Sequence, residues 1–160
     1  MMRSHLLAGL LAALSCSTNG LVFKDKIKQT INGSTLSLLH DTRDATSMQF
    51  GTAPNSNSES WEFNTEGFAD DEAVITPVGS SKSLVCEQGI PCYLDPAGPK
   101  IPIRVTRVDE ENPIFTFQDI PSSLYLSRTP DLYLELRDVQ DESIYFTLEA
   151  IHGKYLRFLS

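Results

Sequence analysis

A short phrase recurs along this chain, and the recurrence constrains the fold more than any other feature of the sequence. An isoleucine is followed within a few residues by Gly or Ser and then by Leu in INGSTLSL from Ile31, ITPVGSSKSLVC from Ile75, IPSSLYLS from Ile120 and IHGKYLRF from Ile151. A second phrase, an aromatic residue followed two positions later by a large apolar residue, occurs at Trp61, Phe115 and Phe146. We therefore expect three units that each run from the first phrase to the second, with the segment from Ile151 as a closing strand.

Alternation of apolar and polar residues predicts that these units are built of strands. Three successive alternate positions are apolar in each of the segments KIPIRVTRV (100–108), DLYLELRD (131–138) and SIYFTLEA (143–150). Turn-forming residues separate these runs at short intervals, which is typical of an all-β protein. Three strand units that cannot bury their own apolar faces can close together as a β-trefoil barrel. Another small β-barrel or a β-sandwich is the alternative. In a trefoil closed by the last phrase, Leu36 and Leu156 should lie near each other in the core.

The first 20 residues have the pattern of a secretory signal peptide. Arg3 precedes a short apolar run at 6–14, and small polar residues follow at 15–18. The apolar run is too short to cross a bilayer, which takes roughly 20 residues. We therefore expect residues 1–20 to be removed and residues 21–160 to form a single soluble, extracellular all-β domain.

The charge of the chain excludes two classes of partner. It contains 21 acidic and 13 basic residues, for a formal net charge of −8. Nucleic-acid binding needs clustered Lys and Arg, and so does binding to an anionic membrane surface. We expect no nucleic-acid partner and no membrane association, and a monomer kept in solution by its own charge.

Two cysteines remain after signal removal, Cys86 and Cys92 in CEQGIPC. An isolated pair in a secreted chain predicts a disulfide, which would stabilise so short a loop by about 2–3 kcal/mol. Zinc would need further Cys or His ligands at ligand spacing, so we expect no metal and no cofactor. Asn32, Gly33 and Ser34 match the N-glycosylation pattern, which predicts an exposed turn that carries a glycan on Asn32 if the protein is a eukaryotic secreted one.

No motif in the sequence predicts catalysis. His40 precedes Asp41, but no nucleophile motif accompanies the pair. The acidic segments 70–72 and 109–111 read as solvated turns, whereas a glycosidase needs two carboxylates held across a cleft. We therefore expect that the chain is not an enzyme.

Three segments resemble the repeated motifs of ricin-B-like lectin β-trefoils, in which SGK-x-L follows a strand and Q-x-W-x-F comes later in each unit. They are SSKSL (80–84), HGKYL (152–156) and ESWEF (59–63), and the resemblance extends over residues 27–160. It implies a β-trefoil that binds carbohydrate through an Asp, an aromatic residue and an Asn or Gln of one unit. It also implies that Trp61 belongs to the core.

These observations predict a secreted, non-enzymatic, lectin-like protein whose partner is a glycan. The candidate binding residues are the pairs Tyr93 with Asp95 and Asp131 with Tyr133, which lie near turns. A tyrosine ring there can stack on a sugar, and the carboxylate can fix its hydroxyl groups.

The alternative function is binding to an extracellular protein, as a trefoil protease inhibitor or as a virulence effector that acts on a host protein. Function in such scaffolds tends to lie in loops. The segments 51–60 and 95–102 are the loops we expect to dock, because proline-stiffened loops lose less entropy on binding.

Overall fold

The computed structural model describes residues 20–40 and 47–151, and almost all of the regular structure there is strand. The elements are β1 (Val22–Ile31), β2 (Ser34–Leu39), β3 (Gln49–Gly51), β4 (Trp61–Asn64), β5 (Glu72–Pro77), β6 (Ser83–Val85), β7 (Tyr93–Asp95), β8 (Ile103–Arg107), β9 (Ile114–Asp119), β10 (Tyr125–Arg128), β11 (Leu134–Arg137), the 3-10 helix η1 (Glu142–Ile144) and β12 (Phe146–Ala150).

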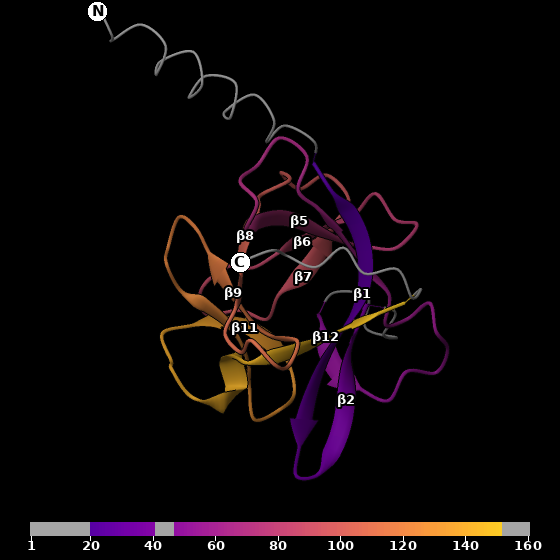
Figure 1. Ribbon diagram of the computed structural model, residues 1–160, viewed down its shortest axis with the longest axis vertical. Coiled ribbons are helices and arrows are strands. Elements are labelled where there is room, and N and C mark those ends of the chain that lie inside the picture. The colour runs from indigo at the N-terminus through magenta and orange to yellow at the C-terminus, as the bar shows by residue number, and fades with distance from the viewer. Residues whose placement is uncertain (1–19, 41–46, 152–160) are drawn as a thin grey trace, which may run out of the picture.

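Six of these strands close into a barrel (Figure 1). β1 pairs with β4, β4 with β5, β5 with β8, β8 with β9, β9 with β12, and β12 with β1 again, and all six pairings are antiparallel. The remaining strands form three hairpins, β2–β3, β6–β7 and β10–β11. A six-stranded barrel with three hairpins is a β-trefoil, so the predicted fold is confirmed. Its three units run from β1 to β4, from β5 to β8 and from β9 to β12.

The three hairpins meet in a ring of backbone hydrogen bonds that displays the pseudo-threefold symmetry. The amide of Met48 donates to the carbonyl of Cys92 (2.9 Å), the amide of Cys92 to that of Leu134 (2.7 Å), and the amide of Leu134 to that of Met48 (3.1 Å). These three residues are therefore equivalent positions of the three units. We call the assembly of the three hairpins the hairpin cap.

The repeated isoleucine phrase marks the same place in each unit. The copies from Ile31 and Ile75 begin within the first strand of their units, and the copy from Ile120 begins directly after β9. Each then continues through the turn into the second strand of its unit. The fourth copy begins at Ile151, directly after β12. The strand that closes the barrel is β12 itself, because Ala150 pairs with Asp25 of β1. Beyond Ile151 the last phrase lies outside the described residues, so its predicted role in closure stays a prediction.

The second phrase was expected on the last strand of each unit, and this prediction is confirmed in two units and wrong in one. Trp61 and Phe146 lie on the fourth strands of the first and third units, β4 and β12. Phe115 lies on β9, the first strand of the third unit, and the fourth strand of the second unit is β8 with Ile103. The pattern misassigns Phe115 because first and fourth strands face the same core and carry the same kind of apolar residue.

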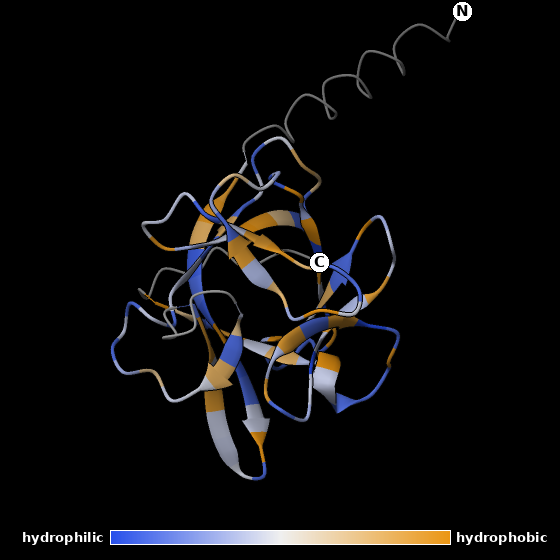
Figure 2. Cartoon of the chain, turned by 180° about the vertical axis from the view of Figure 1, so that it is seen from behind, coloured by the Kyte–Doolittle hydropathy of each residue, from blue (hydrophilic) through white to orange (hydrophobic). Residues whose placement is uncertain are grey.

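Aromatic side chains fill the core of the barrel. The rings of Phe117 and Phe146 have centroids 5.0 Å apart, and Phe63 lies 6.2 Å from Phe117. Trp61 is fully buried and donates its indole N–H to the carbonyl of Leu38 (2.9 Å). Its predicted place in the core is thus confirmed, with its polar group satisfied. Figure 2 shows hydrophobic residues gathered on the strands, while the outer loops are largely hydrophilic.

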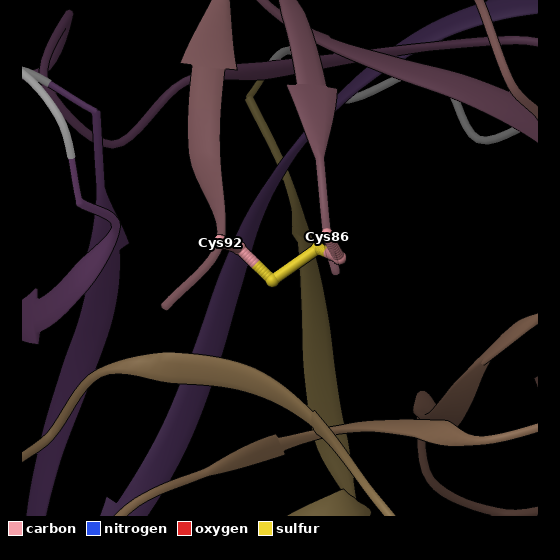
Figure 3. The surroundings of a disulfide bond; sticks show 2 residues. All are labelled: Cys86 and Cys92. Carbon is pink, nitrogen blue, oxygen red and sulfur yellow. A yellow bond between two sulfur atoms is a disulfide. The ribbon is translucent and has the colours of Figure 1, made fainter. Parts of the chain in front are cut away.

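A disulfide joins Cys86 to Cys92, as predicted. It connects the end of β6 to the start of β7, so it closes the turn of the second hairpin (Figure 3). The Cα atoms are 4.4 Å apart, and Cys92 is fully buried in the core cluster.

Several predictions concern residues outside the described ranges. These are the signal peptide (residues 1–20, of which only Gly20 is described), Asp41, and the HGKYL segment with Leu156. In the part of the chain that the structure covers, no helix has the length and apolar character needed to cross a membrane.

Candidate functional site

The first predicted pair, Tyr93 and Asp95, lies on β7 in the hairpin cap. Successive residues of a strand point to opposite sides, so Tyr93 and Asp95 share the face turned away from the buried Cys92. Tyr93 pairs across the hairpin with Val85, and Asp95 pairs with Ser83. Both side chains are half-buried, which leaves each partly open to a ligand.

Two carboxylates act electrostatically on the Tyr93 hydroxyl. Loss of hydration at this position, followed by the negative charges of Glu87 and Asp95, raises the pKa of Tyr93. The hydroxyl is therefore protonated at neutral pH and can donate a hydrogen bond. Asp95 is itself oriented, because one of its oxygens accepts the amide N–H of Ala97 (2.8 Å). Tyr93 thus offers a hydroxyl donor and an aromatic ring, and Glu87 and Asp95 supply carboxylate acceptors in its vicinity.

The second predicted pair, Asp131 and Tyr133, lies in the turn between β10 and β11. The amide of Thr129 donates to the carbonyl of Tyr133 (2.8 Å), and the Thr129 hydroxyl accepts the amide of Tyr133 (3.1 Å). Gln49 of the first unit forms a bridge with Tyr133, and its side chain donates to the carbonyl of Asp131 (3.4 Å). This turn is thus held between two units, with the Asp131 side chain exposed.

The hairpin cap brings the two pairs onto neighbouring hairpins. Tyr93 follows Cys92 and Tyr133 precedes Leu134, and these two inner residues share the hydrogen bond of 2.7 Å described above. The two tyrosines are not equivalent positions, since the counterpart of Tyr93 in the third unit is Glu135. Among the described residues no ring contact joins Tyr93 to Tyr133. The two hairpins are therefore hydrogen-bonded to each other next to these tyrosines, while the two rings form separate aromatic surfaces.

Negative charge at the cap contrasts with paired charge on the barrel wall. Within the described ranges, ion pairs join Lys26 to Glu59 (2.7 Å), Lys28 to Glu149 (2.6 Å), and Arg104 to Asp71 (3.4 Å). Burial opposes ionisation of Glu59, but hydrogen bonds from Lys26 and the Ser37 hydroxyl outweigh it and lower the Glu59 pKa.

The cap carboxylates have no such partners. Glu87, Asp95, Asp131 and Glu135 take part in none of the ion pairs found in the described structure. Near these four carboxylates the cap suits neutral or cationic ligands better than anionic ones.

Two residues whose catalytic or ligand-binding role was considered in the sequence analysis, His40 and Asp109, make contacts within the fold instead. The ring of His40 packs edge-on against Trp61 (5.1 Å between centroids), and its Nε2 lies 3.1 Å from the carbonyl of Ser60. The carboxylate of Asp109 accepts hydrogen bonds from Asn112 and the amide of Glu111, which lower its pKa. In the described ranges, no three His, Cys, Asp or Glu residues are grouped so as to hold a metal ion.

Two polar residues on the inward face of β1 were not predicted. Gln29 is buried, and its side chain donates to the carbonyls of Ser143 (2.8 Å) and Tyr145 (3.1 Å) and accepts from Arg128 (2.8 Å). Asp25 lies four residues earlier, and burial raises its pKa from 3.8 to about 6. The alternation of Phe23, Asp25, Ile27 and Gln29 along one strand is the signal that could have identified both.

Asn32, the candidate glycosylation residue, lies in an exposed turn. It occupies the turn of the β1–β2 hairpin, which extends away from the rest of the molecule in Figure 1. Asn32 and Gly33 both have positive φ, 50° and 79°, as a two-residue turn of this kind needs, and the Asn32 side chain is exposed.

Comparison with known proteins adds information on the fold. No protein-family model matches the chain, and no curated protein sequence matches it. Among solved structures, SeviL bound to asialo-GM1 saccharide is similar, with a TM-score of 0.64 and 16% identity, over 82% of this chain and all (100%) of the SeviL chain. The designed 3-fold symmetric protein ThreeFoil is similar with a TM-score of 0.59 and 13% identity, over 78% of this chain and 96% of that one. At these identities the likeness is one of fold. The chain therefore resembles the ricin-B-like lectin β-trefoils in its architecture, in agreement with the motifs in its sequence.

Proposed function

We propose that this chain is a secreted, non-enzymatic, monomeric protein that binds carbohydrate at its hairpin cap. One observation carries the proposal: the fold is shared over 82% of the chain with SeviL, whose solved structure holds the asialo-GM1 saccharide. The predicted aromatic and acidic residues of the cap supply the chemistry for such a ligand.

The Tyr93 face is the better of the two binding surfaces. Its ring can stack on the apolar face of a sugar, while the protonated hydroxyl and the carboxylates of Glu87 and Asp95 can exchange hydrogen bonds with sugar hydroxyl groups. The same carboxylates would repel sialylated or sulfated glycans. We therefore expect a preference for neutral sugars, with Tyr133 and Asp131 as a second surface on the neighbouring hairpin.

A glycan array with the mature protein tests this proposal. Neutral glycans should give signals that a titration confirms, and Tyr93→Ala should weaken binding by at least about tenfold, or ~1.4 kcal/mol. Tyr145→Ala is the control, because the Tyr145 side chain is exposed (45%) and lies outside the β6–β7 hairpin that carries Tyr93. Absence of binding across the array, or equal loss in both variants, would remove the proposal.

Secretion belongs to the same proposal. The signal-like residues 1–20 and the disulfide support export to an oxidising compartment. Expression of the full chain in a eukaryotic secretory cell should yield a shortened, exported protein. A glycan on Asn32 should be removable by a glycosidase and absent from Asn32→Gln. An unprocessed intracellular product would contradict the proposal.

A further inference from the structure

The three connections between third and fourth strands offer an internal comparison. They are residues 52–60, 96–102 and 138–145, one in each unit. Because the trefoil places their ends at equivalent positions, differences among them come from their own sequences.

The connections of the first and third units are closed structures. In residues 52–60 the amide of Ser58 donates to the carbonyl of Asn55 (3.3 Å), the amide of Ser60 donates to that of Asn57 (3.3 Å), and both serines are buried. In residues 138–145 the chain forms η1, buries Ile144, and offers two carbonyl groups to Gln29.

The connection of the second unit is open. Within the described structure, no backbone–backbone hydrogen bond involves residues 96–102. Five of its seven residues are exposed, among them Lys100 and Ile101, and 42% of Ile101 is accessible. The backbone N–H and C=O groups around Lys100 are therefore free to pair with another chain.

Prolines and anchors nevertheless restrict this segment. Pro96, Pro99 and Pro102 fix their own φ angles and favour extended conformations in the residues before them. Asp95 accepts the amide of Ala97 at one end, and Ile103, the first residue of β8, is buried at the other. The hairpin that precedes the segment is closed by the disulfide. Such preorganisation lowers the entropy lost on binding.

We propose that residues 98–102, which follow the bend at Pro96 and Ala97, dock in an extended conformation in the active-site cleft of a trypsin-like serine protease, with Lys100 in its specificity pocket. The recognition chemistry is twofold. An extended segment with free backbone groups can add to an exposed strand of a partner through main-chain hydrogen bonds. A specificity pocket that contains a carboxylate selects a basic side chain such as that of Lys100. This inhibitory function is independent of carbohydrate binding.

Inhibition of trypsin by the full mature chain tests the proposal. The chain should inhibit cleavage of a small chromogenic substrate and remain intact itself over the assay. Lys100→Ala should weaken inhibition by at least ~100-fold, as expected for a central hot-spot residue. Lys82→Ala is the matched control, since Lys82 is also an exposed lysine of the same unit, in the turn before β6, and this variant should inhibit like the wild type.

A change of specificity provides a second measurement. Lys100→Leu should lose trypsin inhibition and gain inhibition of chymotrypsin, whose pocket is apolar. The proposal is overturned if the wild-type chain does not inhibit trypsin, if it is merely cut after Lys100 as a substrate, or if Lys100→Ala inhibits as well as Lys82→Ala. Glycan binding by these variants should be unchanged, so failure of one function can be told from failure of the other.

Discussion

Residues 96–102 and 138–145 connect equivalent strands, yet the first has no backbone–backbone hydrogen bonds in the described structure, whereas the second forms η1 and buries Ser143 and Ile144. The second unit uses prolines, which remove amide donors and prevent a helical turn. The third unit uses Asp141, whose carboxylate accepts the amide of Ser143 (2.9 Å) and starts η1. The barrel fixes where each connection begins and ends. The residues between decide whether it stabilises the fold or remains available for binding.

The largest expected effect comes from deleting buried volume in the closed connection. Ile144 is 4% exposed, so Ile144→Ala should lower the free energy of unfolding by about 2–4 kcal/mol through lost burial and a residual cavity. Ile101→Ala is the matched change in the open connection and should alter stability by less than about 0.5 kcal/mol. Urea unfolding of both variants measures this. Similar losses would mean that the two connections do not differ as described.

Gln29 gives the next largest effect, because it is the side chain that holds the closed connection to β1. Gln29→Leu leaves the carbonyls of Ser143 and Tyr145 without their donor and Arg128 without its acceptor. We expect a loss of about 1–3 kcal/mol. Gln118→Leu is the control, since its amide donates to the exposed carbonyl of Ser123 and should cost little. Equal effects in thermal unfolding would contradict the role given to Gln29.

The repeat made the fold predictable. Three copies of the isoleucine phrase mark a unit's first strand and the turn after it, and period-two alternation locates most strands. The pattern could not tell β9 from a fourth strand, because Phe115 faces the same core as Trp61. It also placed Leu132 and Ile144 in strands. Leu132 has a φ of 69° in a turn, and Ile144 belongs to η1, because local hydrogen bonds outweigh alternation there.

The candidate site was less accessible to sequence reasoning. Tyr93 and Tyr133 could be chosen because they lie near turns, but the approach of their hairpins depends on the ring of hydrogen bonds through Met48, Cys92 and Leu134. Backbone bonds between distant segments leave no residue signature. The openness of residues 96–102 was indicated by its prolines, whereas the closure of 138–145 depends on Gln29, which is more than a hundred residues away.

Two inward-facing polar residues of β1, the buried Gln29 and the half-buried Asp25, extend this comparison. Gln29 has partners in the third-unit connection, whereas Asp25 has no hydrogen bond or ion pair to another described side chain. Burial raises its pKa from 3.8 to about 6, so the folded state binds the proton more tightly than the unfolded chain. The stabilisation from protonation is fully present below 3.8 and is lost as pH rises through about 6.

Asp25→Asn should therefore increase stability at pH 7 by about 1–2 kcal/mol, a value reduced for partial solvent screening. The gain should disappear near pH 4, where the wild-type carboxyl is protonated. Thermal unfolding measured from pH 4 to pH 7 follows this difference, and Asp70→Asn, at an exposed position, is the control. A gain that does not depend on pH would show that the carboxylate charge of Asp25 is not responsible.

The smallest effect should come from the acid that starts η1. Hydrogen bonds from the Ser143 hydroxyl and amide lower the pKa of Asp141 below 3.8. Because the folded pKa is depressed, the contribution of Asp141 is present above 3.8 and is lost as pH falls through the lower folded value. An NMR titration of the Asp141 carboxyl should give a midpoint below 3.8. Amide exchange of Ser143 should accelerate in Asp141→Ala and stay unchanged in Glu142→Gln, which removes a neighbouring charge and leaves the hydrogen bonds in place. If the Ser143 amide exchanges alike in both variants, negative charge near the start of η1, and not the hydrogen bonds of Asp141, distinguishes this connection from residues 96–102.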